Sequence, residues 1–411
     1  MIFESLNGLV SLLVDAFSSQ GRKIERTIVK ASQLLDKSKG YALFERALSL
    51  TDRLELKSGI VKGDFFAPWN FIALFSLFYL YMAVISPIPI LNPANWAASA
   101  LIFLASMGVL FSTAKLTARR LKGRQIRRLD YERTASAMLF AGSAGILLNF
   151  LYIGVPILQP AIRLYFHNTF YQFFFMVFII GLALTATKAD KPSQLFSLAA
   201  YAGLLTFLTG FRTDFLISVG PVLLTGVYTG VINARKFMAL LALILPGSML
   251  ITLLLLTSGD SGSSLNNLIT GRAGFTMYAL TSAYENVGLT GTAGGGLILN
   301  SFMQFFSHRI MIGGLAAEYS SMLPRYFTST FAGPLLIDGG ILEVLLFSVF
   351  VGAILGALYG LRKKPMFAAF YSIAMWYTFI WVETGPIQFY FLAMHLLFGY
   401  FACALLTQAD K

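Results

Sequence analysis

Side chains suited to covalent and metal chemistry are scarce in this sequence. It has a single cysteine, Cys403, so an internal disulfide and a multi-cysteine metal site are both excluded. Only 12% of its residues are charged and 3 are histidine. Neither a phosphate-binding P-loop nor a His-Glu-x-x-His zinc motif is present. These absences argue against a reaction that depends on nucleotide or metal, and we expect no cofactor.

Charge is missing from long stretches of the chain, and those stretches are strongly apolar. Hydrophobic residues make up 57% of the sequence and the mean hydropathy is +0.72, which excludes a soluble globular protein. Several runs reach the roughly 20 apolar residues that cross a hydrocarbon core. We therefore predict an all-α, polytopic membrane bundle with about ten spans. They are expected at 70–91, 96–114, 134–153, 168–187, 195–210, 215–232, 237–257, 333–360, 367–383 and 387–407.

Lysine is absent from one side of the predicted bundle. When the predicted spans are placed across a bilayer, 26 of the 31 Lys and Arg residues fall on the side opposite the lysine-free one, many of them in the connection 115–133. That side is cytoplasmic by the positive-inside rule. We therefore expect a protein of the cytoplasmic membrane with both termini in the cytoplasm. The net charge of +12 then indicates attraction to anionic membrane lipids and not to nucleic acid. The outer side carries only arginines, namely Arg163, Arg212, Arg272, Arg309 and Arg325.

Two segments are too polar to cross the membrane. Residues 1–65 contain many charges, and their apolar residues recur at helical spacing, so we predict cytoplasmic amphipathic helices on the membrane surface. A small soluble helical hairpin is the alternative. The outer connection 258–332 is long and rich in apolar and aromatic residues, which argues against disorder. We predict that it forms short helices over the outer face, and that 66–411 is one bundle including this loop.

Arginines suit the recognition of phosphate groups. Their planar, permanently charged side chains donate two hydrogen bonds side by side. Arg212 lies in the turn Thr209-Gly-Phe-Arg-Thr-Asp214, where the simpler interpretation is a surface pair with Asp214. Arg272 lies between two glycines, which allow the chain to approach a ligand closely. Two such arginines match a diphosphate and could stabilise the charge that develops on its leaving oxygen.

The outer loop also holds a candidate base, His308, beside Arg309. Neighbouring arginines favour a neutral imidazole, the form that accepts a proton from a hydroxyl group. A structural histidine is the alternative. We further expect substrate contacts from a second set of outer residues, which comprises Arg309, Arg325, Arg163, Tyr319, Tyr326 and Asp338.

Three short segments carry a resemblance to a known family. They are the Thr209–Asp214 turn, the Gly271-Arg-Ala-Gly274 start of the long loop, and Thr328-Ser-Thr-Phe-Ala-Gly-Pro-Leu-Leu-Ile-Asp338-Gly-Gly entering a span that ends in Gly356-Ala-Leu-Tyr-Gly360. With them, residues 134–407 resemble the Wzy-type oligosaccharide repeat-unit polymerases, whose architecture is similar to that of the O-antigen ligases. Residues 1–65 have no counterpart in this resemblance.

The resemblance implies a GT-C-like glycosyltransferase that works outside the cytoplasm without metal. A glycan would leave its polyprenyl diphosphate carrier and join an acceptor sugar of another lipid-linked repeat unit, and a chain-length regulator protein would be a partner. By position, Arg212, Arg272 and His308 would be the catalytic residues. Two alternatives stay open: ligation of the glycan to another acceptor, and a flippase or exporter of the same lipid. A flippase needs a polar path through the spans, and the sequence shows none near the midplane.

Overall fold

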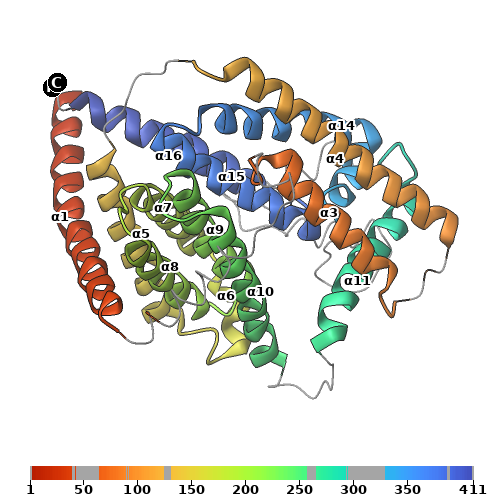
Figure 1. The fold of residues 1–411 in the computed structure, drawn as a ribbon, viewed down its shortest axis with the longest axis horizontal. Coiled ribbons are helices and arrows are strands. Elements are labelled where there is room, and N and C mark those ends of the chain that lie inside the picture. The colour runs from red at the N-terminus through yellow and green to blue at the C-terminus, as the bar shows by residue number, and fades with distance from the viewer. Residues whose placement is uncertain are drawn as a thin grey trace.

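In the computed structural model, all regular secondary structure of the described residues is helical (Figure 1). Each predicted span coincides with one helix, which makes the protein an integral, polytopic membrane protein. The structure describes residues 2–38, 42, 64–88, 90, 92–124, 131–256, 265–292, 294, 329–386 and 389–409. The helices that match the predicted spans are α3 (Pro68–Val84), α4 (Pro93–Leu121), α5 (Glu132–Ile153), α7 (Thr169–Ala186), α8 (Pro192–Phe207), α9 (Arg212–Tyr228), α10 (Ala234–Leu256), α14 (Gly333–Leu361), α15 (Pro365–Thr384) and α16 (Phe389–Ala409).

Five of these helices are both long and apolar enough to cross a membrane by themselves, among the residues described. They are α4, α5, α7, α14 and α15, while α3 is apolar but shorter, with 17 residues. The first span differs most from its prediction, because α3 ends at Val84 and not near residue 91. Prolines at 87 and 89 explain the difference, since neither can donate the hydrogen bond that continues a helix.

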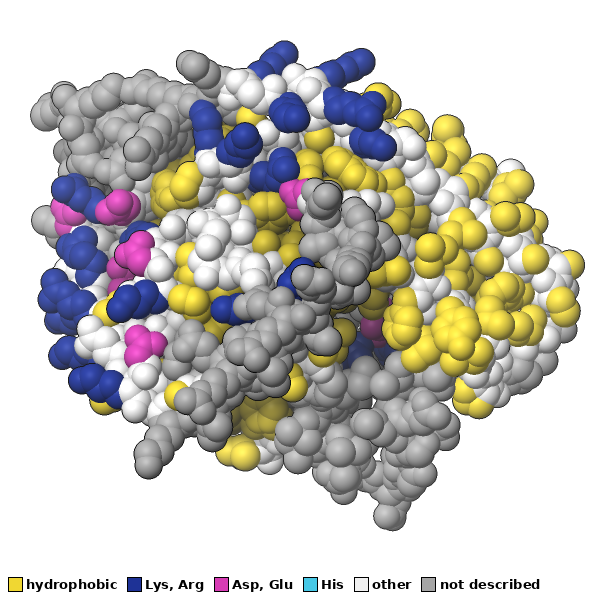
Figure 2. Space-filling view, viewed as in Figure 1, with side chains coloured by type: hydrophobic (Ala, Val, Ile, Leu, Met, Phe, Trp, Pro, Cys, Tyr) yellow, Lys and Arg dark blue, Asp and Glu magenta, His cyan; other side chains and the backbone are white. Residues whose placement is uncertain are grey.

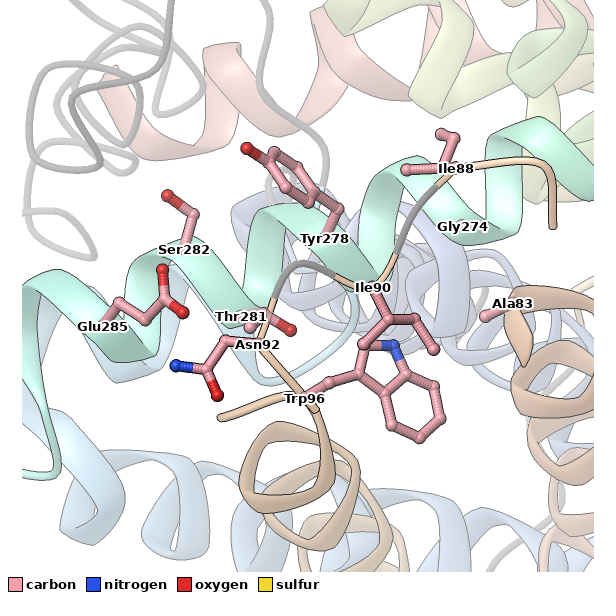
Figure 3. Close-up of a pocket in the computed structure, with 10 residues that line it drawn as sticks. All are labelled: Ala83, Ile88, Ile90, Asn92, Trp96, Gly274, Tyr278, Thr281, Ser282 and Glu285. Carbon is pink, nitrogen blue, oxygen red and sulfur yellow. The ribbon is translucent and has the colours of Figure 1, made fainter. Parts of the chain in front are cut away.

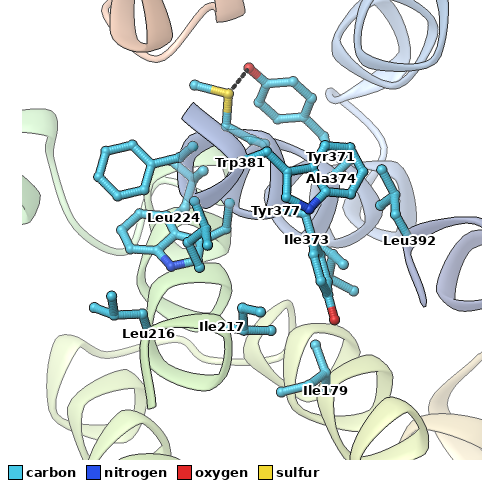
Figure 4. Packing of buried hydrophobic residues seen from close by; sticks show 14 of the residues in the cluster. Ile179, Leu216, Ile217, Leu224, Tyr371, Ile373, Ala374, Tyr377, Trp381 and Leu392 are labelled. Carbon is cyan, nitrogen blue, oxygen red and sulfur yellow. Dashed lines mark hydrogen bonds between the residues drawn. The ribbon is translucent and has the colours of Figure 1, made fainter. Parts of the chain in front are cut away.

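Close helix packing builds the bundle around α15. Nearly every residue of this helix is buried, and Tyr371, Tyr377 and Trp381 fill the core that it shares with α7 and α9 (Figure 4). On the far side, α14 packs against α4 through a row of glycines. A Cβ atom at Gly356 would lie 2.3 Å from the carbonyl oxygen of Ala114, so only glycine permits this approach.

The helix α14 is broken near its start. Gly340 has a φ of 71°, a conformation that favours glycine, and the helical hydrogen bonds stop there. The segment that follows α11 (Leu265–Val287) replaces them: the backbone N–H groups of Thr292 and Gly294 donate to the carbonyl oxygens of Ile337 and Asp338, each at 2.9 Å. Irregular backbone inside a membrane protein needs such partners.

The N-terminal segment forms one helix, α1 (Ile2–Asp36), that packs against α5 and α8. Glu25 accepts hydrogen bonds from Ser136 Oγ at 2.8 Å and from Lys188 Nζ at 3.1 Å, and Gly21 lies directly on the Ser136 backbone. The sequence also favours a second helix at about 41–57, and that stretch lies outside the described residues except for Ala42, which is helical.

Basic and hydrophobic side chains occupy different parts of the face shown in Figure 2. Lys and Arg gather at the left and along the top of Figure 2, whereas the right side is mainly hydrophobic. The left edge is where α1 lies in the same view (Figure 1). The orientation of the termini stays a prediction.

Candidate functional site

Two arginines from distant parts of the chain meet on one carboxylate. Arg212 is the first residue of α9, Arg272 lies in α11, and Glu383 is the second-last residue of α15. Arg212 Nη2 lies 2.6 Å from Glu383 Oε1, and Arg272 Nε lies 2.9 Å from the same oxygen. Their side chains remain 24% and 41% exposed, so both guanidinium groups can still be reached from solvent.

These three residues line a cavity of about 260 Å³. One part of its lining is polar and includes Thr213, Ser248 and Thr384, while the remainder is apolar and aromatic. Tyr79 of α3 is hydrogen bonded to Thr276 of α11, which ties two walls of the cavity together. The apolar lining residues are Phe75, Phe78, Met82, Leu216, Leu245, Ala273, Phe379 and Ile380.

The charges of the cavity favour an anion. Two arginines and one carboxylate leave a net charge of about +1, and each guanidinium group has five N–H donors. Among the described residues, each guanidinium donates only to Glu383. The remaining donors can therefore bind the oxygens of a phosphate group in the side-by-side geometry that lysine cannot offer.

A second cluster anchors the start of α9. Asp214 is only 3% exposed and accepts three hydrogen bonds: from His167 Nε2 at 2.9 Å, Tyr171 Oη at 2.5 Å and Thr209 Oγ1 at 3.3 Å. The simpler interpretation of the turn, a pair between Arg212 and Asp214, is therefore wrong. Residues two apart on a helix point to opposite sides, so Asp214 holds the helix to α7 while Arg212 projects into the cavity.

The other predicted site residues are not all brought to the cavity. Asp338 is buried at the break in α14 and does not line it. Arg163 begins the short helix α6 (Arg163–Phe166), and its side chain is not among those that the structure describes. The predictions for the rest of the long loop fall on residues that the structure does not describe, namely His308, Arg309, Tyr319, Arg325 and Tyr326.

Sequence reasoning missed the residues that complete the site. Glu383 lies at the outer end of the predicted span 367–383, where an acid has to find a cation. That signal pointed to the arginine partners but could not say which ones. Tyr79 gave no signal, because nothing in the sequence distinguishes it from the other aromatic residues of the predicted span 70–91.

Residues 64–395 match the model of the protein family described as "Putative O-antigen polymerase". The match covers most of the chain. The protein belongs to the O-antigen polymerase family. This agrees with the resemblance found in the sequence, and membership implies a lipid-linked oligosaccharide as substrate. No curated protein and no solved structure matches the chain.

Proposed function

We propose that this O-antigen polymerase family member joins lipid-linked oligosaccharide repeat units at the outer face of the cytoplasmic membrane. In each step the anomeric carbon of the donor glycan forms a bond to an acceptor hydroxyl oxygen. Its bond to the polyprenyl diphosphate breaks, the diphosphate leaves with the electron pair, and the hydroxyl proton is released. Neither nucleotide nor metal takes part in this scheme.

The convergence of Arg212 and Arg272 on one cavity carries the proposal. A diphosphate diester bears about two negative charges and gains more as its bond to the sugar breaks. Donors already aimed at that charge stabilise the transition state more than the bound substrate, which is what accelerates a reaction. In the absence of substrate, Glu383 holds both guanidinium groups beside the place where the diphosphate would lie.

The apolar part of the cavity supports a lipid as the donor. Phe75, Phe78 and Met82 of α3 face the same space as the arginines, together with Leu245 of α10. A polyprenyl chain can lie against such side chains while its diphosphate reaches the charged end. A water-soluble sugar nucleotide has no long apolar chain to lie against this lining.

A reconstituted reaction tests the proposal. Purified protein in liposomes, supplied with lipid-linked repeat unit from the source cells, is expected to form a ladder of longer glycans in the presence of chelator and without nucleotide. The double variant Arg212→Ala with Arg272→Ala should form none. Strict dependence on a divalent cation would contradict the scheme. Transfer to an acceptor other than a lipid-linked unit would indicate a ligase, and transbilayer movement without a new bond would indicate a flippase.

The anchor at Asp214 predicts a coupling with Arg212. Asp214→Asn removes the charge that three donors share, so we expect a loss of about 1–3 kcal/mol in the free energy of unfolding. Binding of polyprenyl diphosphate should weaken about tenfold, because Arg212 is no longer held in place. A double-mutant cycle measures whether the loss of polyprenyl diphosphate binding in Asp214→Asn depends on Arg212.

The two arginines provide matched backgrounds for that cycle. In Arg212→Ala, adding Asp214→Asn should cost little further binding, while in Arg272→Ala it should cost the full tenfold. Equal losses in both backgrounds would mean that Asp214 supports the fold in general and does not position Arg212.

A further inference from the structure

A second recess lies along the same helix that carries Arg272. It is formed where the connection between α3 and α4 crosses α11, and its lining runs from Gly274 to Glu285 on that helix (Figure 3). The crossing is close, because a Cβ atom at Gly274 would lie 2.0 Å from Ser86 Oγ. The recess and the arginine cavity are therefore on neighbouring parts of one element.

The chemistry of this recess differs from that of the cavity. Among its described lining residues there is no Lys or Arg, and Glu285 is the only charged one. A phosphate group would be repelled here. The remaining lining combines an aromatic and aliphatic part, with Trp96, Ile88 and Ile90, and a polar part with Asn92 and Thr281.

Two polar atoms in the recess are available to a ligand. Asn92 uses Oδ1 to accept from the backbone N–H of Asn95 at 3.2 Å, and Asn95 Nδ2 donates to Glu285 Oε1 at 2.9 Å. Within the described part of the chain, Asn92 Nδ2 and Glu285 Oε2 then have no partner. One is a donor and the other an acceptor, and Figure 3 shows the two side chains close together.

We propose that this recess binds a non-acidic sugar of the lipid-linked glycan. A sugar ring offers an apolar face of C–H groups that packs on an aromatic ring, and hydroxyl groups that both donate and accept. Trp96 suits the first, and the Asn92–Glu285 pair suits the second. The enclosed space is about 40 Å³, so the recess holds one edge of a ring and does not surround it.

The distance along α11 fits an extended glycan. Glu285 is thirteen positions after Arg272, which is about 20 Å along a helix. A ligand with its diphosphate at Arg272 and a sugar at Glu285 must be an oligosaccharide, since a single sugar is too short. This inference rests on the proposed function and adds to it a site that recognises sugars apart from the diphosphate.

Glu285→Gln and Trp96→Ala test the sugar site, with Tyr152→Ala as the control. Tyr152 is an aromatic residue of α5 that is 88% exposed and does not line the recess. Two measurements are made: the KM for the lipid-linked repeat unit, and the affinity for polyprenyl diphosphate that carries no sugar. We expect the KM to rise about tenfold in both recess variants, the affinity for the sugar-free carrier to stay within about twofold, and the control to match the wild type.

The two measurements separate the possible failures. An unchanged KM in Glu285→Gln would overturn the sugar site, even if Trp96→Ala failed to fold. Equal weakening of both ligands would also overturn it, because the recess would then act only by shaping α11 around Arg272. If the wild type fails to bind the sugar-free carrier, the proposed diphosphate site itself is contradicted.

Discussion

Arg272→Lys is expected to lower glycan polymerisation nearly as far as Arg272→Ala, by at least about 100-fold, the usual effect of losing one donor to a developing charge. The same holds for Arg212→Lys. Lysine keeps the positive charge, so a site that needed only charge would tolerate it. A guanidinium group can instead bond to Glu383 and to a diphosphate oxygen at once, in a fixed plane. Initial rates of chain growth in liposomes measure the effect.

Arg235→Lys is the matched control, because Arg235 lies at the start of α10, away from the cavity. It should keep wild-type activity, and all variants should be compared at equal amounts of folded protein. If both cavity lysine variants polymerise at the wild-type rate, the side-by-side grip on a diphosphate is wrong and the arginines serve only to pair with Glu383.

The positions of the helices could be predicted from the sequence because spans in a membrane have a strong signal. Length and hydropathy located a helix at each predicted span, and the errors lay at the ends. The break before residue 91 could have been recognised from Pro87 and Pro89, which disfavour helix on both sides. In the long loop, the semi-apolar stretch 273–289 favours a short helix. The structure has a longer one there, α11, which starts at Leu265 in a polar stretch without apolar periodicity and ends at Val287.

The site was predicted only in part because its contacts join distant segments. Outer arginines could be counted, and two of the five do share a cavity. Their partner could not be chosen, since Asp214 is two residues from Arg212 while Glu383 is 171 residues away. The nearby acid was the natural choice, but the helix that starts at Arg212 turns the two side chains apart. The role predicted for His308 stays a prediction.

Glu383→Gln is expected to separate turnover from binding. Without the carboxylate, the charge of the empty site rises from about +1 to +2, and the two guanidinium groups repel each other with no anion between them. They lose the arrangement that the transition state requires, so we expect turnover to fall about 100-fold. A diphosphate can itself draw them together, so binding of polyprenyl diphosphate should be unchanged or tighter.

Binding to the purified variant and single-turnover rates distinguish this outcome from simple damage. Glu132→Gln, at the opposite end of the bundle at the start of α5, removes the same charge and should change neither quantity. Weaker binding together with slower turnover would mean that Glu383 is needed to build the cavity and nothing more. The expected combination, tight binding with slow transfer, would instead make Glu383 the residue that keeps both arginines aligned before the diphosphate arrives, which is a reason for an acid to lie in a site that binds an anion.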